Sequence, residues 1–220
     1  DKYSDLMLSL QYNDTERLFP DYDEKNTKWM TKAKDKDELN LNLQWNKRKV
    51  DQNQKLNIYY NDHDKMKQNI TAGKDPKEFD TKTQGMIFEQ TDYYQSHTLV
   101  YGLEARQNEL DASGTKSSDG HYENLNTGVF IQDKWEVTDL WQLNFGGRYD
   151  DHEEYGSEFS PRLGAVYSLT DSLNLHFSAG EGYRAPSFND LYMDMGTDPN
   201  SNLEPESATS YETGLKYFQS

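Results

Sequence analysis

Apolar and polar residues alternate one by one along much of this chain. Between residues 39 and 46, leucine and tryptophan occupy the odd positions, while asparagine and glutamine fill the even ones. The same alternation returns at 141–149 and at 173–180. Because successive side chains of a strand point to opposite faces, this pattern predicts strands with one apolar and one wet face.

Ten segments show the pattern, and many have about the 9–11 residues that a tilted strand needs to cross a bilayer. Strands of soluble proteins are shorter, with about five or six residues. The predicted strands are 4–12, 38–47, 54–62, 84–94, 97–107, 127–137, 140–150, 160–169, 172–184 and 208–217.

Long and short connections alternate between these strands. The predicted loops are 13–37, 63–83, 108–126, 151–159 and 185–207, and the predicted turns are 48–53, 95–96, 138–139 and 170–171. Up-and-down barrels of outer membranes have short turns on the periplasmic side and long loops outside. The fold predicted is therefore all-β, an antiparallel up-and-down transmembrane β-barrel whose first strand runs outward.

Aromatic residues fit the same frame, because amphipathic rings favour both membrane interfaces. The predicted girdle beside the short turns holds Trp45, Trp135 and Trp141, and the one near the long loops holds Tyr12, Tyr60, Tyr149 and Tyr183.

Composition supports a wet interior. Only 33% of the residues are hydrophobic and mean hydropathy is −1.09, yet 13% are aromatic. Polar side chains cannot pack a dry core unpaired, but they line a water-filled lumen without penalty. No apolar run approaches the roughly 18 residues of a membrane helix, which excludes helical spans but not barrel strands.

Charge and cysteine content exclude other classes. The formal net charge of −16 would repel phosphate backbones, so no nucleic-acid partner is expected. The chain has no cysteine, which excludes disulfides and thiolate metal sites. The first residues do not resemble a signal peptide, so any export signal is expected outside this sequence.

The C-terminal half carries specific motifs. They are GVFIQDKW at 128–135, GRYD at 147–150, FSPRLG at 159–164, GEGYRAPSFNDLY at 180–192, NLEPE at 202–206 and YETGLKY at 211–217. In order and spacing they resemble the barrel of TonB-dependent outer-membrane receptors. Residues 1–127 resemble that family only in their barrel pattern.

The resemblance implies a barrel of about 22 strands with a plug domain in its lumen. Residues 1–220 are then a partial β-barrel domain of about ten strands, with the plug domain absent from this chain. The implied partners are TonB, reached through the missing plug, and outer-membrane lipid and lipopolysaccharide. The implied location is the outer membrane of a Gram-negative bacterium.

The function implied is uptake of a ferric siderophore or similar metal chelate. Ferric siderophores are commonly anionic, and the polar positions of the strands carry Arg106, Arg148, Arg162 and Arg184. These arginines and Tyr183 are the candidate ligand-binding residues. Pairing with plug carboxylates remains an equal alternative for the arginines, and Arg184 is also suited to brace a loop.

An acidic cluster follows the 147–150 motif. Asp150, Asp151, Glu153 and Glu154 offer hard oxygen ligands of the kind that Ca²⁺ prefers. Their spacing matches no EF-hand, so a solvated acidic loop is the competing interpretation. No other cofactor is expected.

Rival functions remain open. Cobalamin and haem are alternative cargoes, although no histidine lies between Pro186 and Asn202, and only His121 or His152 of other loops would serve haem. A complete ten-stranded outer-membrane enzyme would close its first strand on its last, and no catalytic constellation supports one. A secreted soluble β-domain would have shorter strands and unsorted loops.

Overall fold

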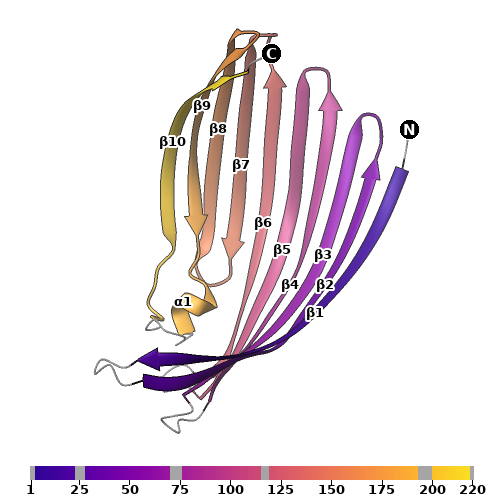
Figure 1. Ribbon diagram of the computed structural model, residues 1–220. Coiled ribbons are helices and arrows are strands. Elements are labelled where there is room, and N and C mark those ends of the chain that lie inside the picture. Colours follow the sequence, from indigo (N-terminus) through magenta and orange to yellow (C-terminus); the bar gives the residue numbers. More distant parts are fainter. Residues whose placement is uncertain (1–2, 23–27, 70–75, 115–118, 193–199, 219–220) are drawn as a thin grey trace.

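The computed structural model describes residues 3–22, 28–69, 76–114, 119–192 and 200–218. They form one antiparallel sheet of ten strands, whose order in space is their order in the sequence (Figure 1). The predicted all-β, up-and-down fold is therefore confirmed. The strands are β1 (Tyr3–Tyr22), β2 (Lys28–Arg48), β3 (Gln52–Asn69), β4 (Lys77–Tyr94), β5 (His97–Ser113), β6 (Gly120–Glu136), β7 (Trp141–His152), β8 (Gly156–Thr170), β9 (Leu173–Arg184) and β10 (Glu206–Tyr217).

The short turns all lie at one end of the sheet, the upper end in Figure 1. They span 49–51, 95–96, 137–140 and 171–172, close to the predicted positions. The opposite end of the sheet is called here the outer end. Residues 23–27, 70–75 and 115–118 lie outside the described residues.

The predicted long loops 13–37, 63–83 and 108–126 are wrong over most of their length, because β1–β6 continue through them. Apolar alternation marks only the part of a strand that faces lipid. Beyond it the backbone ladder continues between polar residues, as where Asn108 donates to Asn124 at 2.8 Å. The predicted loop 151–159 shrinks to residues 153–155, and Gly156, at φ 74°, permits that tight turn.

Cross-strand register keeps the two kinds of side chain on separate faces. One apolar row runs Leu8, Leu43, Ile58, Met86, each residue opposite the next. On the other face, called here the polar face, a row runs Asn40, Asn61, Thr83, Asn108, Asn124. The alternation predicted from sequence is thus a property of the whole sheet.

Aromatic rings border the apolar face near the short turns. Trp141 stacks on Tyr167 with ring centroids 4.6 Å apart, and Trp45 donates from Nε1 to Ser4 at 3.0 Å. Near the outer end Tyr149 lies opposite Phe159. Tyr183 breaks the predicted girdle, because its ring turns toward the polar face.

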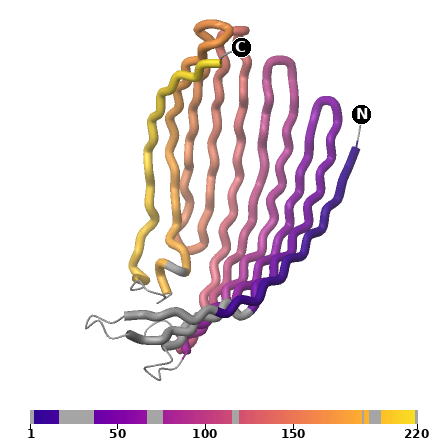
Figure 2. The backbone as a smooth tube through the Cα atoms, viewed as in Figure 1, coloured from indigo at the N-terminus to yellow at the C-terminus, as the bar shows by residue number. Residues whose placement is uncertain are grey.

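The outermost strands leave their outer edges unpaired within the described residues. β1 pairs only with β2, and β10 only with β9. The backbone trace shows the two edges well apart (Figure 2). The ten-stranded closed barrel considered from the sequence is therefore rejected.

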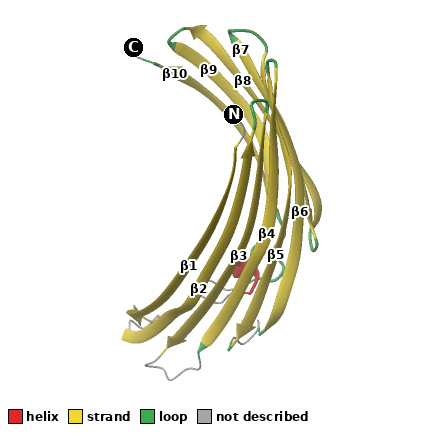
Figure 3. Cartoon of the chain, turned by 90° about the vertical axis from the view of Figure 1, so that its right-hand side faces the viewer, coloured by secondary structure: helices red, strands yellow, loops and turns green. Residues whose placement is uncertain are grey.

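Among the described residues there is one hydrophobic core, and it is small. It lies at the outer end of the polar face. Helix α1 (Phe188–Tyr192) follows β9 and lies against this face (Figure 3). Its Phe188 and Tyr192 pack on buried Phe79 and Leu110. The segment that directly follows β9 is thereby held against the interior side of the sheet.

No helix in the described ranges is both long and apolar enough to cross a bilayer.

A substitution on the apolar face tests the assignment of faces. Leu163 is 55% exposed and lies four residues from Tyr167 on one side and from Phe159 on the other, midway between the aromatic borders. We expect Leu163→Arg to lower the free energy of unfolding in a bilayer by about 2–4 kcal/mol. Gln142→Arg, on the polar face, should change it by less than about 1 kcal/mol because water reaches that side. Equal losses in a denaturant titration in vesicles would contradict the assignment.

Candidate functional site

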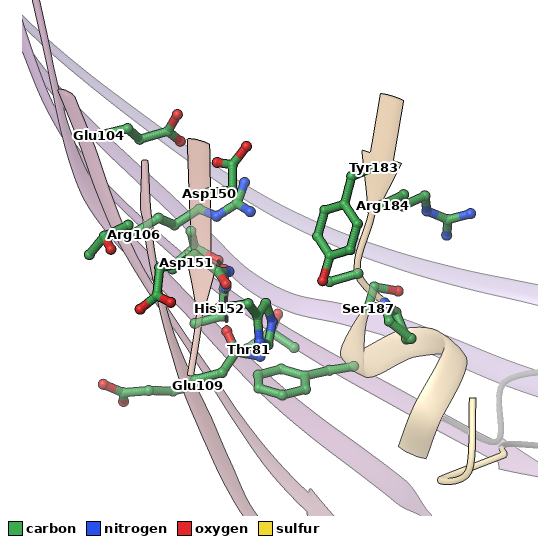
Figure 4. Close-up of a pocket in the computed structure, with 18 of the residues that line it drawn as sticks. Thr81, Glu104, Arg106, Glu109, Asp150, Asp151, His152, Tyr183, Arg184 and Ser187 are labelled. Carbon is green, nitrogen blue, oxygen red and sulfur yellow. Dashed lines mark hydrogen bonds between the residues drawn. The ribbon is translucent and has the colours of Figure 1, made fainter. Parts of the chain in front are cut away.

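A cavity of about 600 Å³ lies on the polar face near the outer end. One wall is formed by β3–β7, and the other by the segment from Tyr183 to Phe188, at the end of β9 and the start of α1 (Figure 4). The two walls come from segments that are far apart in the sequence. The cavity therefore exists only because α1 packs back on the sheet. Polar and charged side chains dominate its lining.

Register places three polar side chains side by side on the sheet wall. Arg106 of β5 lies opposite Asn126 of β6, which lies opposite His152 of β7. On the side of Arg106 away from Asn126 lies Gly85 of β4, which has no side chain to contact the guanidinium. The guanidinium of Arg106 is exposed to the cavity and has no ion pair or hydrogen bond among the described residues.

His152 is only 5% exposed although it lines the cavity. Its Nδ1 accepts the backbone N–H of Glu154 at 3.1 Å, and its ring lies 4.8 Å from that of Tyr155. A nitrogen that accepts a hydrogen bond carries no proton, so the ring proton of the neutral imidazole is on Nε2. The ring is thereby a fixed hydrogen-bond donor.

Arg148 is held in place by carboxylates. Its Nη2 lies 2.9 Å from Glu104 and 2.7 Å from Asp150, and the guanidinium lies 5.9 Å from the centroid of the Phe130 ring. Gly128 makes room for this arrangement, since a Cβ there would come within 2.5 Å of Nη2. The charge of Arg148 is therefore neutralised within the wall.

Arg184 braces the segment that follows β9. Its Nη2 lies 2.9 Å from Asp190 of α1, and its Nη1 lies 3.5 Å from Glu206 of β10. Asp190 also accepts hydrogen bonds from the Ser187 hydroxyl at 2.7 Å and the Ser187 N–H at 3.1 Å. These hydrogen bonds hold the pKa of Asp190 below its usual range. The bracing role suggested from sequence is what these contacts support.

Tyr183 and Arg184 point to different sides of their strand. Figure 4 shows the Tyr183 ring directed into the cavity and the Arg184 guanidinium extending away from it. The Tyr183 hydroxyl is buried and has no hydrogen-bond partner in the described parts of the chain. The pairing of β8 with β9 ends at Arg162 and Gly180, so β9 is free to twist beyond that point.

Four of the five predicted ligand-binding residues meet at this cavity, namely Arg106, Arg148, Tyr183 and Arg184. Arg162 does not, because it lines a different hollow between β7, β8 and β9 with Asn144 and His176. Sequence reasoning did not single out Asn126 as a cavity residue. The register of the paired strands, counted from the short turns, places Asn126 between Arg106 and His152 and would have identified it.

The predicted calcium ligands are not gathered around one point. Asp150 binds Arg148, Asp151 accepts from the Ser157 hydroxyl at 2.7 Å, and Glu153 accepts from the Leu125 N–H at 3.0 Å. Glu154 contributes its backbone N–H to His152. These contacts favour the solvated-loop interpretation, and calcium binding there stays a prediction.

Elsewhere among the described residues, one acidic trio has ligand oxygens within 4.8 Å of one another. It comprises Asp62, Asp64 and Asp80 at the outer ends of β3 and β4. Lys82 pairs with Asp80 at 2.8 Å, and Tyr60 donates to Asp62 at 2.8 Å. Local cations and donors thus offset part of this negative charge.

Comparison with known proteins gives the family. The family described as "TonB dependent receptor-like, beta-barrel" matches residues 2–220. The chain is 32% identical over 130 residues to the iron-regulated outer membrane virulence protein of Vibrio cholerae, which covers 55% of this chain and 20% of that protein. It is 33% identical over 138 residues to the vitamin B12 transporter BtuB of Photobacterium profundum, covering 61% and 22%.

Solved structures agree in fold. A variant of the ferric enterobactin receptor PfeA of Pseudomonas aeruginosa has a TM-score of 0.74 at 16% identity, covering 88% of this chain and 33% of that one. The FrpB iron transporter of Neisseria meningitidis has a TM-score of 0.75 at 15% identity, covering 97% and 40%.

The chain belongs to the TonB-dependent receptors, within their β-barrel. Its relatives are outer-membrane proteins and transporters, so the alternatives of a barrel enzyme and a secreted soluble domain are rejected. The chain spans about a fifth of the length of the curated relatives it matches.

The Arg184–Asp190–Ser187 contacts should protect the segment between β9 and β10. We expect Asp190→Ala to raise the rate at which a protease added to intact cells cuts this segment about two- to fivefold, because a half-exposed ion pair contributes less than about 1 kcal/mol. Glu204→Gln, which removes an exposed carboxylate nearby, is the control and should leave the rate unchanged. Equal rates for Asp190→Ala and the natural protein would contradict the bracing role.

The same contacts predict a pH dependence. Because the pKa of Asp190 is lowered in the folded protein, its stabilisation is complete above the ordinary carboxyl pKa of about 3.9 and is lost as pH falls through the lowered value. With an acid-tolerant protease and purified receptor, cleavage should be constant near neutrality and accelerate below about pH 4. The Asp190→Ala variant should lack the part of this acceleration that comes from Asp190.

Proposed function

We propose that the receptor containing this chain takes up a ferric siderophore or a similar anionic metal chelate. The observation that carries the proposal is the unpaired guanidinium of Arg106 in a polar cavity on the interior side of the sheet. An unneutralised cation flanked by hydrogen-bond donors favours anionic oxygens over neutral or cationic cargo.

The names of relatives support iron as the cargo metal. The curated relative from Vibrio cholerae is called iron-regulated, and structural neighbours are called ferric enterobactin receptor, siderophore receptor and iron transporter. Uptake would depend on TonB acting through a plug domain, in a barrel surrounded by outer-membrane lipid and lipopolysaccharide.

Cobalamin is the second candidate, supported by the 33% identity to a vitamin B12 transporter. Haem is less well supported. No histidine lies between Pro186 and Asn202. The Nδ1 of His121 lies 2.8 Å from Asp111, and this hydrogen bond raises the pKa of His121. His152 is buried against Tyr155.

Growth of the natural host tests the proposal. In a strain lacking this gene we expect loss of growth on one of the ferric chelates when that chelate is the sole iron source. The natural gene should restore growth. A ferric tris-catecholate, a ferric trihydroxamate and ferric citrate would be supplied separately. Radioactive iron uptake from the active chelate should stop in cells lacking TonB, which separates energised transport from leakage.

Cobalamin-dependent growth of the same strains serves as the parallel assay. Loss of cobalamin uptake with unchanged use of all three ferric chelates would overturn the proposal and favour the second candidate.

A further inference from the structure

The three arginines that line the cavity differ in whether carboxylates of the protein already neutralise their charge. Arg148 contacts Glu104 and Asp150, and Arg184 contacts Asp190 and Glu206. A guanidinium with two carboxylates has little attraction left for a further anion. Within the described residues, Arg106 alone among these three has no carboxylate partner.

The neighbours of Arg106 have hydrogen-bonding groups that the protein leaves unused. The Nε2–H of His152 has no acceptor in the described part of the chain, and the residue is only 5% exposed. The hydroxyl of Tyr183 and the Oδ1 of Asn126 are buried and likewise lack partners among those residues. A buried polar group without a partner is costly, so the Tyr183 hydroxyl, with the unused imidazole N–H of His152 in the same cavity, indicates a ligand that accepts hydrogen bonds. The Oδ1 of Asn126 is an acceptor and would need a donor group of the ligand instead.

We propose that Arg106, His152 and Tyr183 form the contact that binds an anionic oxygen of the cargo, with Asn126 beside them. The guanidinium supplies the charge, and the imidazole N–H and phenol O–H supply directed hydrogen bonds. Arg106 and His152 lie on the sheet wall and Tyr183 on the opposite wall, so a ligand oxygen between the walls is approached from both sides (Figure 4).

The other polar groups are excluded from this role for structural reasons. Arg148 and Arg184 orient parts of the wall and the β9–α1 segment, and Arg162 lies in another hollow. The inference rests on the proposed function for the identity of the cargo. The chemistry that it names, an anionic oxygen, is shared by ferric catecholates and by the phosphodiester of cobalamin.

Equilibrium binding to the complete receptor in detergent tests the contact. The probes are a ferric tris-catecholate, a ferric trihydroxamate, ferric citrate and cyanocobalamin. The variants are Arg106→Gln, Arg106→Lys and His152→Leu, with Arg162→Gln as the matched control. We expect Arg106→Gln and His152→Leu to raise Kd for the bound probe about tenfold to a hundredfold, the effect of losing a hydrogen bond to a charged group. Arg106→Lys should recover part of the loss, and Arg162→Gln should leave Kd unchanged.

Salt dependence separates a binding role from a structural one. Binding to the natural receptor should weaken as salt screens the exposed guanidinium, and this dependence should be reduced in Arg106→Gln. Heat-modifiable migration on gels checks that each variant forms its barrel. If Arg106→Gln does not form one, the Arg106→Lys and His152→Leu variants carry the test.

The outcomes distinguish the two proposals. If a ferric probe binds and neither the Arg106 nor the His152 variants weaken its binding, the anion contact is wrong and the proposed function stands. If only cyanocobalamin binds and the variants weaken it, the proposed cargo is wrong and the contact stands. If cyanocobalamin alone binds and is unaffected, or none of the four probes binds, both are overturned.

Discussion

The continuous ladder of backbone hydrogen bonds from β1 to β10 is the constraint on which the rest of the structure depends. In hydrocarbon no water is available to satisfy a backbone N–H or C=O, so each strand must bond to its neighbours along its whole span. The ladder fixes register, and register fixes which side chains share a face. Leu43 and Ile58 are therefore adjacent on the lipid side, while Arg106 and Asn126 are adjacent on the interior side.

The ladder also explains why the strands are longer than the segments in which apolar and polar residues alternate. Once the register is set within the membrane, extending a hairpin outward adds backbone bonds without requiring an apolar face. The long β1–β6 hairpins raise a polar wall at the outer end, against which α1 packs through Phe188 and Tyr192. The cavity lies between this wall and the start of α1, so its position follows from hairpin length and from one small aromatic cluster.

Charge within the wall is arranged by local pairing. The chain is strongly acidic, with 39 acidic and 23 basic residues, so most arginines near a carboxylate are neutralised by it. Arg148 and Arg184 show this, and their pairs hold β5–β7 and the β9–α1 segment in place. Because Gly85 and Asn126 flank Arg106, no carboxylate reaches it along its cross-strand row. An acidic protein can thus keep the guanidinium of Arg106 available in its interior.

The sequence by itself determined the strand number, the sorting of turns to one end and the apolar face, because these depend on period and spacing along the chain. It also placed Arg106 and Arg148 on the interior side by parity. Only the tertiary structure decided that Arg148 is paired, that Arg162 lies apart, and that Tyr183 turns inward where β9 loses its pairing with β8. Those outcomes depend on contacts between strands distant in sequence and on local twist, and a residue's own neighbours in the chain specify neither.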